Sequence, residues 1–179
     1  MTETDGALAR AALRGDRSAF AELYDRRARW IRAICFDTTN DLHSAADLTQ
    51  EVFLRAYSKL DSLREPERFA AWLTGIARQV CREWRRGRLR DRQVACSFPE
   101  DVEPAARRHE ADPRLETLRE ALAKLPERER LSLQAFYLQG LDAEQARSVL
   151  GLSKSTFYRV LAKARERLAA IHRRVEVGS

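Results

Sequence analysis

The chain has 179 residues, of which 44% are hydrophobic and 34% are charged, and its formal net charge of +6 gives a pI near 9.6. This length suits one modest domain or two small ones, and the positive charge favours a polyanionic partner, although a solvated basic surface would give the same balance. No apolar run approaches the ~18 residues of a membrane span, and the first twelve residues lack the features of a signal peptide, so we expect a cytoplasmic protein without membrane insertion.

Three helices are predicted in the first half of the chain. The first begins near Arg17, because Asp16 can cap it and because apolar residues then recur at intervals of three and four. The second is predicted from about Ser44, which has the spacing of a capping box with Asp47, to about Leu60. A third stripe, ended by Gly87, consists of Phe69, Trp72, Leu73, Ile76, Val80 and Trp84.

The second predicted helix has two different faces. Its broad inner face consists of Leu48, Thr49, Val52, Phe53, Ala56, Tyr57 and Leu60. The opposite face gathers Asp47, Gln50, Glu51 and Leu54. A leucine among polar groups is typical of a protein-binding patch for a basic partner, while the alternative is an ordinary solvated face with one stray leucine.

The outer face of the third predicted helix is basic. It carries Arg78, Gln79, Arg82 and Arg85, followed by Arg86, Arg88, Arg90 and Arg92. Trp72 and Trp84 lie in the same stretch, and aromatic rings beside arginine suit unpaired bases. Because both rings also fit the apolar stripe, we assign them to packing first.

Residues 93–114 have the composition of a flexible acidic linker, with three of the five prolines, no glycine and more acidic than basic side chains. We therefore predict an all-α protein of two small helical domains, residues 1–92 and 115–174, joined by this linker. The second domain opens with a leucine stripe that closes at Pro126, a residue well placed in the first turn of the next helix.

The last segment has the pattern of a helix-turn-helix. Asp142 and Gln145 can cap one helix reciprocally, Gly151 suits the tight turn, and Ser153 can cap a second helix to about Leu168. Ser155, Arg159 and Lys163 point outward from that helix, flanked by Lys154, Thr156 and Tyr158, and these six residues are the candidate DNA contacts. We expect Arg159 to read base edges and Lys163 to contact phosphate, whereas the alternative is an ordinary helical hairpin with a basic exterior.

Signals of catalysis, cofactors and metals are missing from the sequence. The three histidines are scattered, the three cysteines (Cys35, Cys81 and Cys96) form no CxxC pair, and no catalytic motif or phosphate-binding glycine loop occurs. We therefore expect no enzyme, no cofactor and no metal site, and we interpret the cysteines as buried or incidental thiols.

Four segments in order resemble the extracytoplasmic-function (ECF) sigma factors. They read RGDRSAFAELYDRRARWIRAIC, DLTQEVFLRAYSKL, RFAAWLTGIARQVCREWRR and, after the linker, LREALAKLPERERLSLQAFYLQGLDAEQARSVLGLSKSTFYRVLAKARERL. The resemblance covers nearly the whole chain and includes only the second and fourth conserved sigma regions. It implies a subunit that directs RNA polymerase core to promoters and assists strand opening.

The resemblance assigns roles to these surfaces. The patch with Asp47, Gln50, Glu51 and Leu54 would dock on core polymerase, and the C-terminal helix-turn-helix would read the minus-thirty-five element. The segment 61–69 would capture a base flipped from the minus-ten element. The minus-ten contacts would be Arg64, Arg68, Arg78, Gln79, Arg82, Arg85 and Arg86. An anti-sigma factor or another regulator is a further expected partner.

Two positions depart from the family pattern. Most relatives have Asn where this chain has Gln79, and the recognition helix reads KSTFYRVLAKAR where Thr-Val before a basic residue is more usual. The alternative function is a helix-turn-helix transcriptional regulator whose N-terminal domain binds a protein or an effector. A third possibility is an adaptor that binds RNA or an acidic partner without sequence preference.

Overall fold

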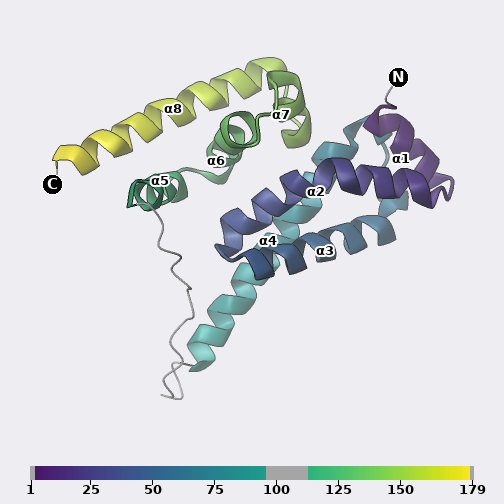
Figure 1. Ribbon diagram of the computed structural model, residues 1–179, viewed down its shortest axis with the longest axis horizontal. Coiled ribbons are helices and arrows are strands. Elements are labelled where there is room, and N and C mark those ends of the chain that lie inside the picture. The colour runs from purple at the N-terminus through teal and green to yellow at the C-terminus, as the bar shows by residue number, and fades with distance from the viewer. Residues whose placement is uncertain (1–2, 96–112, 178–179) are drawn as a thin grey trace. The chain divides into compact units, whose positions relative to one another are not determined.

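The computed structural model describes residues 3–95 and 113–177, and the chain divides into two compact units, residues 1–106 and 107–179 (Figure 1). Within the described residues every regular element is a helix, which confirms the predicted all-α class. None of these helices is both long and apolar enough to cross a membrane. The predicted acidic linker, residues 93–114, lies outside the described residues except at its edges, where helices enter it from both sides.

Unit 1 is a helical bundle. Its elements are α1 (Asp5–Leu13), α2 (Arg17–Thr39), α3 (Leu42–Ser58), η1 (Leu60–Ser62), η2 (Pro66–Arg68) and α4 (Phe69–Ala95). The helices α2, α3 and α4 contact one another in pairs, and α1 lies against α2 and η2. Leu23, Ile31, Leu73 and Phe69 are completely buried between them. Each such side chain stabilises the fold by about 1.5–3 kcal/mol, so this apolar centre is the main source of the bundle's stability.

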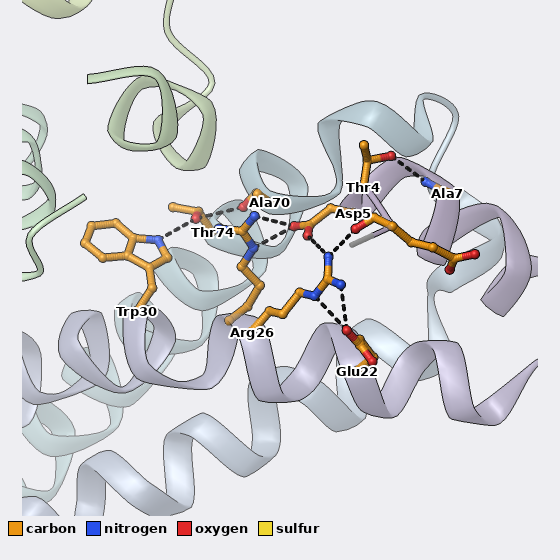
Figure 2. A network of polar contacts seen from close by, with 10 residues as sticks. Thr4, Asp5, Ala7, Glu22, Arg26, Trp30, Ala70 and Thr74 are labelled. Atoms are coloured by element: carbon orange, nitrogen blue, oxygen red, sulfur yellow. Dashed lines mark hydrogen bonds and ion pairs between the residues drawn. The ribbon is translucent and has the colours of Figure 1, made fainter. Parts of the chain in front are cut away.

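Polar contacts inside unit 1 fix how its helices meet (Figure 2). The indole N–H of Trp30 on α2 donates to Thr74 Oγ1 on α4 at 3.0 Å, and the Thr74 hydroxyl donates to the Ala70 carbonyl at 2.9 Å. Elsewhere on α2, Arg26 lies between Glu22 and Asp5. Its guanidinium nitrogens are 2.6 Å from Glu22 Oε1 and 3.6 Å from Asp5 Oδ1. These contacts tie α2 to α4 at one point and to α1 at another.

Two cysteines that are far apart in the sequence meet in this core. Cys35 on α2 and Cys81 on α4 are buried free thiols, and Cys81 Sγ lies 4.0 Å from the carbonyl oxygen of Ile34, the residue before Cys35. The hydrogen bond with Cys81 and the burial raise the pKa of the Cys35 thiol, so it stays protonated at neutral pH. Cys96 lies outside the described residues.

The helix boundaries of unit 1 differ from the prediction at three places. The helix α1 was not predicted, and α3 begins at Leu42 because Asp41, rather than Ser44, caps it by accepting from the Ser44 N–H at 2.7 Å. The helix α4 does not end at Gly87 but continues to Ala95. A helical glycine costs only about 1 kcal/mol relative to alanine, and Arg88 stacks over Trp84 across this turn, 5.4 Å from the ring centroid.

The inner face predicted for α3 is correct except at its edge. Thr49, Val52, Phe53 and Ala56 are buried, but Tyr57 is 50% exposed. Its ring packs edge-on against Phe20 of α2 at a centroid distance of 5.0 Å, at the border of the interface between the two helices. A tyrosine suits this border because its ring packs while its hydroxyl stays hydrated.

Unit 2 is a smaller group of helices. Its elements are α5 (Pro113–Ala123), α6 (Glu127–Leu133), the π-helical turn η3 (Gln134–Leu138), α7 (Ala143–Leu150) and α8 (Lys154–Val177). Pro126 was predicted in the first turn of α6, but it is the N-cap residue just before this helix. The helix α8 runs nine residues beyond the predicted end at Leu168. Arg167 on this extended helix forms a 3.1 Å ion pair with the buried carboxylate of Glu129 on α6, so α8 is anchored well past its first turns.

Candidate functional site

The outer face of α3 carries the predicted polymerase-docking residues. Asp47, Gln50 and Leu54 are exposed, and Glu51 is half-buried. The spacing of three, four and seven residues places them on one side of the helix, opposite the face that packs on the bundle. Packing within the protein does not account for an apolar side chain at position 54, because 60% of the surface of Leu54 is exposed. The face therefore presents an apolar centre with an acidic and amide rim.

Thr49 lies within the same stretch of α3 but belongs to the core. It is 1% exposed, and its hydroxyl donates to the Ala45 carbonyl at 2.7 Å. Its side chain consequently supports the helix from inside and takes no part in the exposed face.

A chain of charged and amide groups joins α3 to α4. Arg55 donates from Nε to Glu51 Oε1 at 2.6 Å and from Nη1 to Glu83 Oε2 at 2.5 Å. The other oxygen of Glu83 accepts from the Gln79 amide nitrogen at 3.0 Å. Hydrogen bonds from Arg55 and from Gln79 hold the pKa of Glu83 below its ordinary value, so the carboxylate is ionised at neutral pH. The contacts of Arg55 with Glu51 and of Gln79 with Glu83 join residues four apart in one helix, a spacing that is visible in the sequence. The contact between Arg55 and Glu83 joins two helices and has no such signal.

The basic face of α4 is presented to solvent as predicted. Gln79, Arg82, Arg85 and Arg86 are exposed, and Arg78 is half-buried. Trp72 and Trp84 are half-buried, and Trp72 packs against Phe69 at 5.8 Å between ring centroids. This agrees with the assignment of both rings to packing first.

The segment between α3 and α4 is short and braced. Leu60 and Leu63 are buried at its beginning, whereas Arg64 and Arg68 are exposed, and Arg68 forms a 3.3 Å ion pair with Glu65. The two predicted minus-ten arginines thus stand on a segment whose apolar side chains are fixed in the core.

Helix α1, which sequence reasoning missed, supports this segment. Arg10 forms an ion pair with Glu67, and this hydrogen bond from Arg10 lowers the pKa of the Glu67 carboxyl. Gly6 brings the two backbones together, because a Cβ at Gly6 would lie 3.2 Å from Glu67 Cα. The available signal was the spacing of Gly6, Leu8, Ala9 and Ala12, the small or apolar residues that α1 buries.

The helix-turn-helix of unit 2 forms as predicted. Asp142 and Gln145 make the reciprocal capping box of α7, and Gly151 takes the left-handed conformation at a φ of 64°. Ser153 caps α8 by accepting from the Thr156 N–H at 3.3 Å. Local hydrogen bonds therefore fix the turn and the direction in which α8 leaves it.

Five of the six predicted DNA-binding residues of α8 lie on its exposed side. Lys154, Ser155, Tyr158, Arg159 and Lys163 are exposed. Thr156 is half-buried, and its hydroxyl accepts from Ser153 at 2.9 Å within the cap.

The unusual Phe157 of this helix is an internal residue. It is completely buried and packs against Phe136 at 6.2 Å between ring centroids. Phe157 therefore contributes to the packing of α8 against the rest of unit 2. It is not part of the exposed surface of α8.

The described residues hold no group of three metal-binding side chains. The arrangement offers charged and amide groups at solvated surfaces, together with one exposed leucine. Such surfaces suit binding of a macromolecule rather than the enclosure of a small reactant.

Comparison with known proteins places both units in established families. Residues 23–91 match Sigma-70 region 2, and residues 115–168 match Sigma-70, region 4. The chain is 30% identical to the ECF RNA polymerase sigma factor SigM of Mycobacterium tuberculosis over 169 residues, which cover 94% of this chain and 84% of that protein. It is 29% identical to the probable RNA polymerase sigma factor RfaY of Xanthomonas campestris, with 86% of this chain covered, but spans only 40% of that relative's length.

Solved structures of similar fold include two complexes. CnrH, solved with the cytosolic domain of CnrY, has a TM-score of 0.64 and 25% identity, with 99% of this chain and 100% of that chain covered. The sigma factor RpoE of Bartonella quintana, solved with the anti-sigma factor NepR, has a TM-score of 0.57 and 24% identity, with 86% and 96% covered. The second likeness shows the fold alone.

Proposed function

The chain belongs to the ECF RNA polymerase sigma factors, and from this premise we propose that it directs core RNA polymerase to specific promoters and assists strand opening. The observation that carries the proposal is the coexistence, in unit 1, of an acidic face with an exposed leucine on α3 and an arginine-rich face on α4. Sigma factors need both a polymerase contact and a DNA contact. Its place of action is then the cytoplasm, where polymerase and promoters are.

Polymerase docking is assigned to the face formed by Asp47, Gln50, Glu51 and Leu54. Leu54 supplies apolar area that only a partner can bury, and the surrounding acidic and amide groups suit a basic helical surface. Glu51 enters this contact already paired with Arg55, so its carboxylate is held in one orientation before binding.

Minus-ten recognition is assigned to the basic side of unit 1. The arginines of α4 would contact phosphate and the separated strand, while Arg64 and Arg68 would flank a base flipped into the segment 61–69. The buried side chains of Leu63 and Phe69 in that segment support this role, because a pocket for a flipped base needs a fixed backbone.

Minus-thirty-five recognition is assigned to α8. Arg159 reaches base edges in the major groove, and Lys154 and Lys163 contact phosphates on either side. Ser155, Thr156 and Tyr158 complete the contact at the N-terminal end of the helix, where exposed N–H groups also favour phosphate.

Regulation by a protein that covers one of these faces belongs to the same proposal. An anti-sigma factor or a comparable regulator would compete with polymerase for unit 1 or with DNA for either unit. The support comes from CnrH, a solved structure of similar fold that was seen with the cytosolic domain of CnrY.

The docking assignment is tested by replacing Asp47, Gln50 and Glu51 together with alanine and measuring capture of core polymerase. We expect affinity to fall by about tenfold or more, while the helical circular dichroism spectrum stays unchanged. The matched control removes two other exposed helical carboxylates, Asp25→Ala with Glu120→Ala, and so loses the same charge. Equal capture by the triple variant and the control would refute the docking face.

A further inference from the structure

The side chain of Gln79 is held in one orientation. Its amide nitrogen lies 3.0 Å from Glu83 Oε1, one helical turn along α4. Glu83 itself is fixed by Arg55 of α3, whose Nη1 donates to the other carboxylate oxygen at 2.5 Å. An exposed glutamine would otherwise sample several rotamers, so this contact restricts a side chain at the proposed DNA surface.

The carboxylate of Glu83 determines which atoms of the Gln79 amide remain available for hydrogen bonds with DNA. An ionised carboxylate only accepts hydrogen bonds, so Glu83 selects the NH₂ group of Gln79 and rejects its carbonyl oxygen. The low pKa of Glu83 keeps that carboxylate ionised at neutral pH. Gln79 is left with Oε1 as an acceptor and with one remaining N–H as a donor.

A side chain that presents an acceptor beside a donor matches the major-groove edge of one base, adenine. On the major-groove edge, adenine offers the N6 amine as a donor and N7 as an acceptor, and glutamine can bind both. Guanine offers two acceptors on that edge, thymine one acceptor and a methyl group, and cytosine only its amine. When it reads the major groove of the element before the strands separate, the amide of Gln79, as Glu83 holds it, therefore favours adenine.

We propose that Glu83 is a positioning residue for promoter reading, which orients the Gln79 amide so that it selects adenine at one position of the minus-ten element. Arg55 is the second positioning residue, because it holds Glu83 from α3. The inference rests on the proposed function and deepens it, since it names the base and the residues that impose it.

Arg55 also connects the two faces of unit 1. It binds Glu51, a residue of the proposed docking face, at 2.6 Å, and Glu83 at 2.5 Å. A substitution at Arg55 would disturb both faces, whereas a substitution at Glu83 leaves the pair between Arg55 and Glu51 in place. Glu83 is therefore the residue that tests base reading separately from docking.

The experiment uses transcription by core polymerase with the full chain on a promoter library randomised in the minus-ten element. Sequencing of the initiated transcripts gives the base preference at each position. Gln79→Ala identifies the position that Gln79 reads, as the one whose preference it abolishes. The wild-type protein should favour adenine there by about tenfold, the discrimination typical of a bidentate contact.

Glu83→Gln then tests the positioning role. Its amide is nearly the same size as the carboxylate but both donates and accepts, so the orientation of Gln79 is no longer fixed. We expect the adenine preference at that position to fall about fivefold or more while other positions are unchanged. The matched control is Asp91→Asn, which neutralises another exposed carboxylate of α4 and should keep the preference.

Three outcomes would contradict the inference, and they differ in what else they affect. An unchanged preference in Glu83→Gln overturns the positioning role, and a preference for thymine, guanine or cytosine in the wild type overturns the reading of adenine by the held amide, but both leave the sigma function standing. Absence of promoter-specific transcripts with the wild-type protein overturns the function and this inference together. A loss of preference confined to the Gln79 position supports the inference.

Discussion

Replacing Thr74 by valine removes the hydroxyl that joins α2 to α4. Valine has nearly the same shape, so packing is kept, but the indole N–H of Trp30 loses its acceptor at 3.0 Å. Both side chains are only 4% exposed, so water cannot replace the hydroxyl. Leaving a buried donor unsatisfied costs about 1–3 kcal/mol. The backbone carbonyl of Ala70 keeps its helical hydrogen bond, so no further polar group is stranded.

The assay is urea unfolding followed by tryptophan fluorescence. All three tryptophans, Trp30, Trp72 and Trp84, belong to unit 1, so the signal reports that unit alone. With a urea slope of about 2 kcal/mol per molar, the Thr74→Val midpoint should fall by about 0.5–1.5 M. Thermal unfolding should shift by about 4–8 °C for each kcal/mol lost.

Thr74→Ser is the control. It keeps the hydroxyl and loses one methyl group, which costs about 0.8 kcal/mol. The hydrogen-bond argument requires valine to be more destabilising than serine. If serine lowers the free energy of unfolding as much as valine or more, packing of the methyl group dominates and the argument is wrong.

Three further predictions concern local contacts. Asp142→Ala removes the capping box of α7 and should lower the stability of unit 2 by about 1 kcal/mol, seen as faster amide hydrogen exchange in α7; unchanged exchange would exclude the cap as a determinant. Gly6→Val places a Cβ 3.0 Å from Glu67 Oε1 and 3.2 Å from its Cα, so we expect a loss of about 1–3 kcal/mol in the fluorescence assay, and wild-type stability would contradict the close approach. Because Arg55 holds the pKa of Glu83 below its ordinary value of 4.5, the carboxylate stabilises the fold above that pH and this contribution is lost as the pH falls through the lower folded-state pKa. The wild-type protein should therefore have a higher free energy of unfolding than Glu83→Gln at pH 7 and lose this advantage at strongly acidic pH. A difference that does not change with pH would contradict a stabilising role for the ionised carboxylate.

The sequence predicted most of the helices because their signals are local. Asp16, the Asp142 capping box and Gly151 each act within one or two turns, and the structure confirms all three. Gly87 was misread because a glycine ends a helix only where the chain adopts a left-handed conformation, and here Gly87 stays helical. Helix α1 was missed because its nine residues are few for a periodic pattern and include a glycine.

The exposed faces were also predictable, but their connections were not. Helical periodicity places Asp47 and Leu54 on one side of α3 whatever the rest of the fold does. The pairs Arg55 with Glu83 and Arg10 with Glu67 join residues 28 and 57 positions apart, and they depend on where two elements cross. Periodicity states which way a side chain points but not which helix it meets there. The roles of these residues in polymerase and DNA binding stay predictions.

The central claim is that this chain gives core polymerase a promoter specificity. Its most direct test is transcription in vitro by core RNA polymerase of the source bacterium on its fragmented genomic DNA, with and without the purified chain, followed by mapping of transcript starts. We predict new starts that share upstream elements near minus ten and minus thirty-five and that depend on the chain. Identical start maps in the two reactions would contradict the claim.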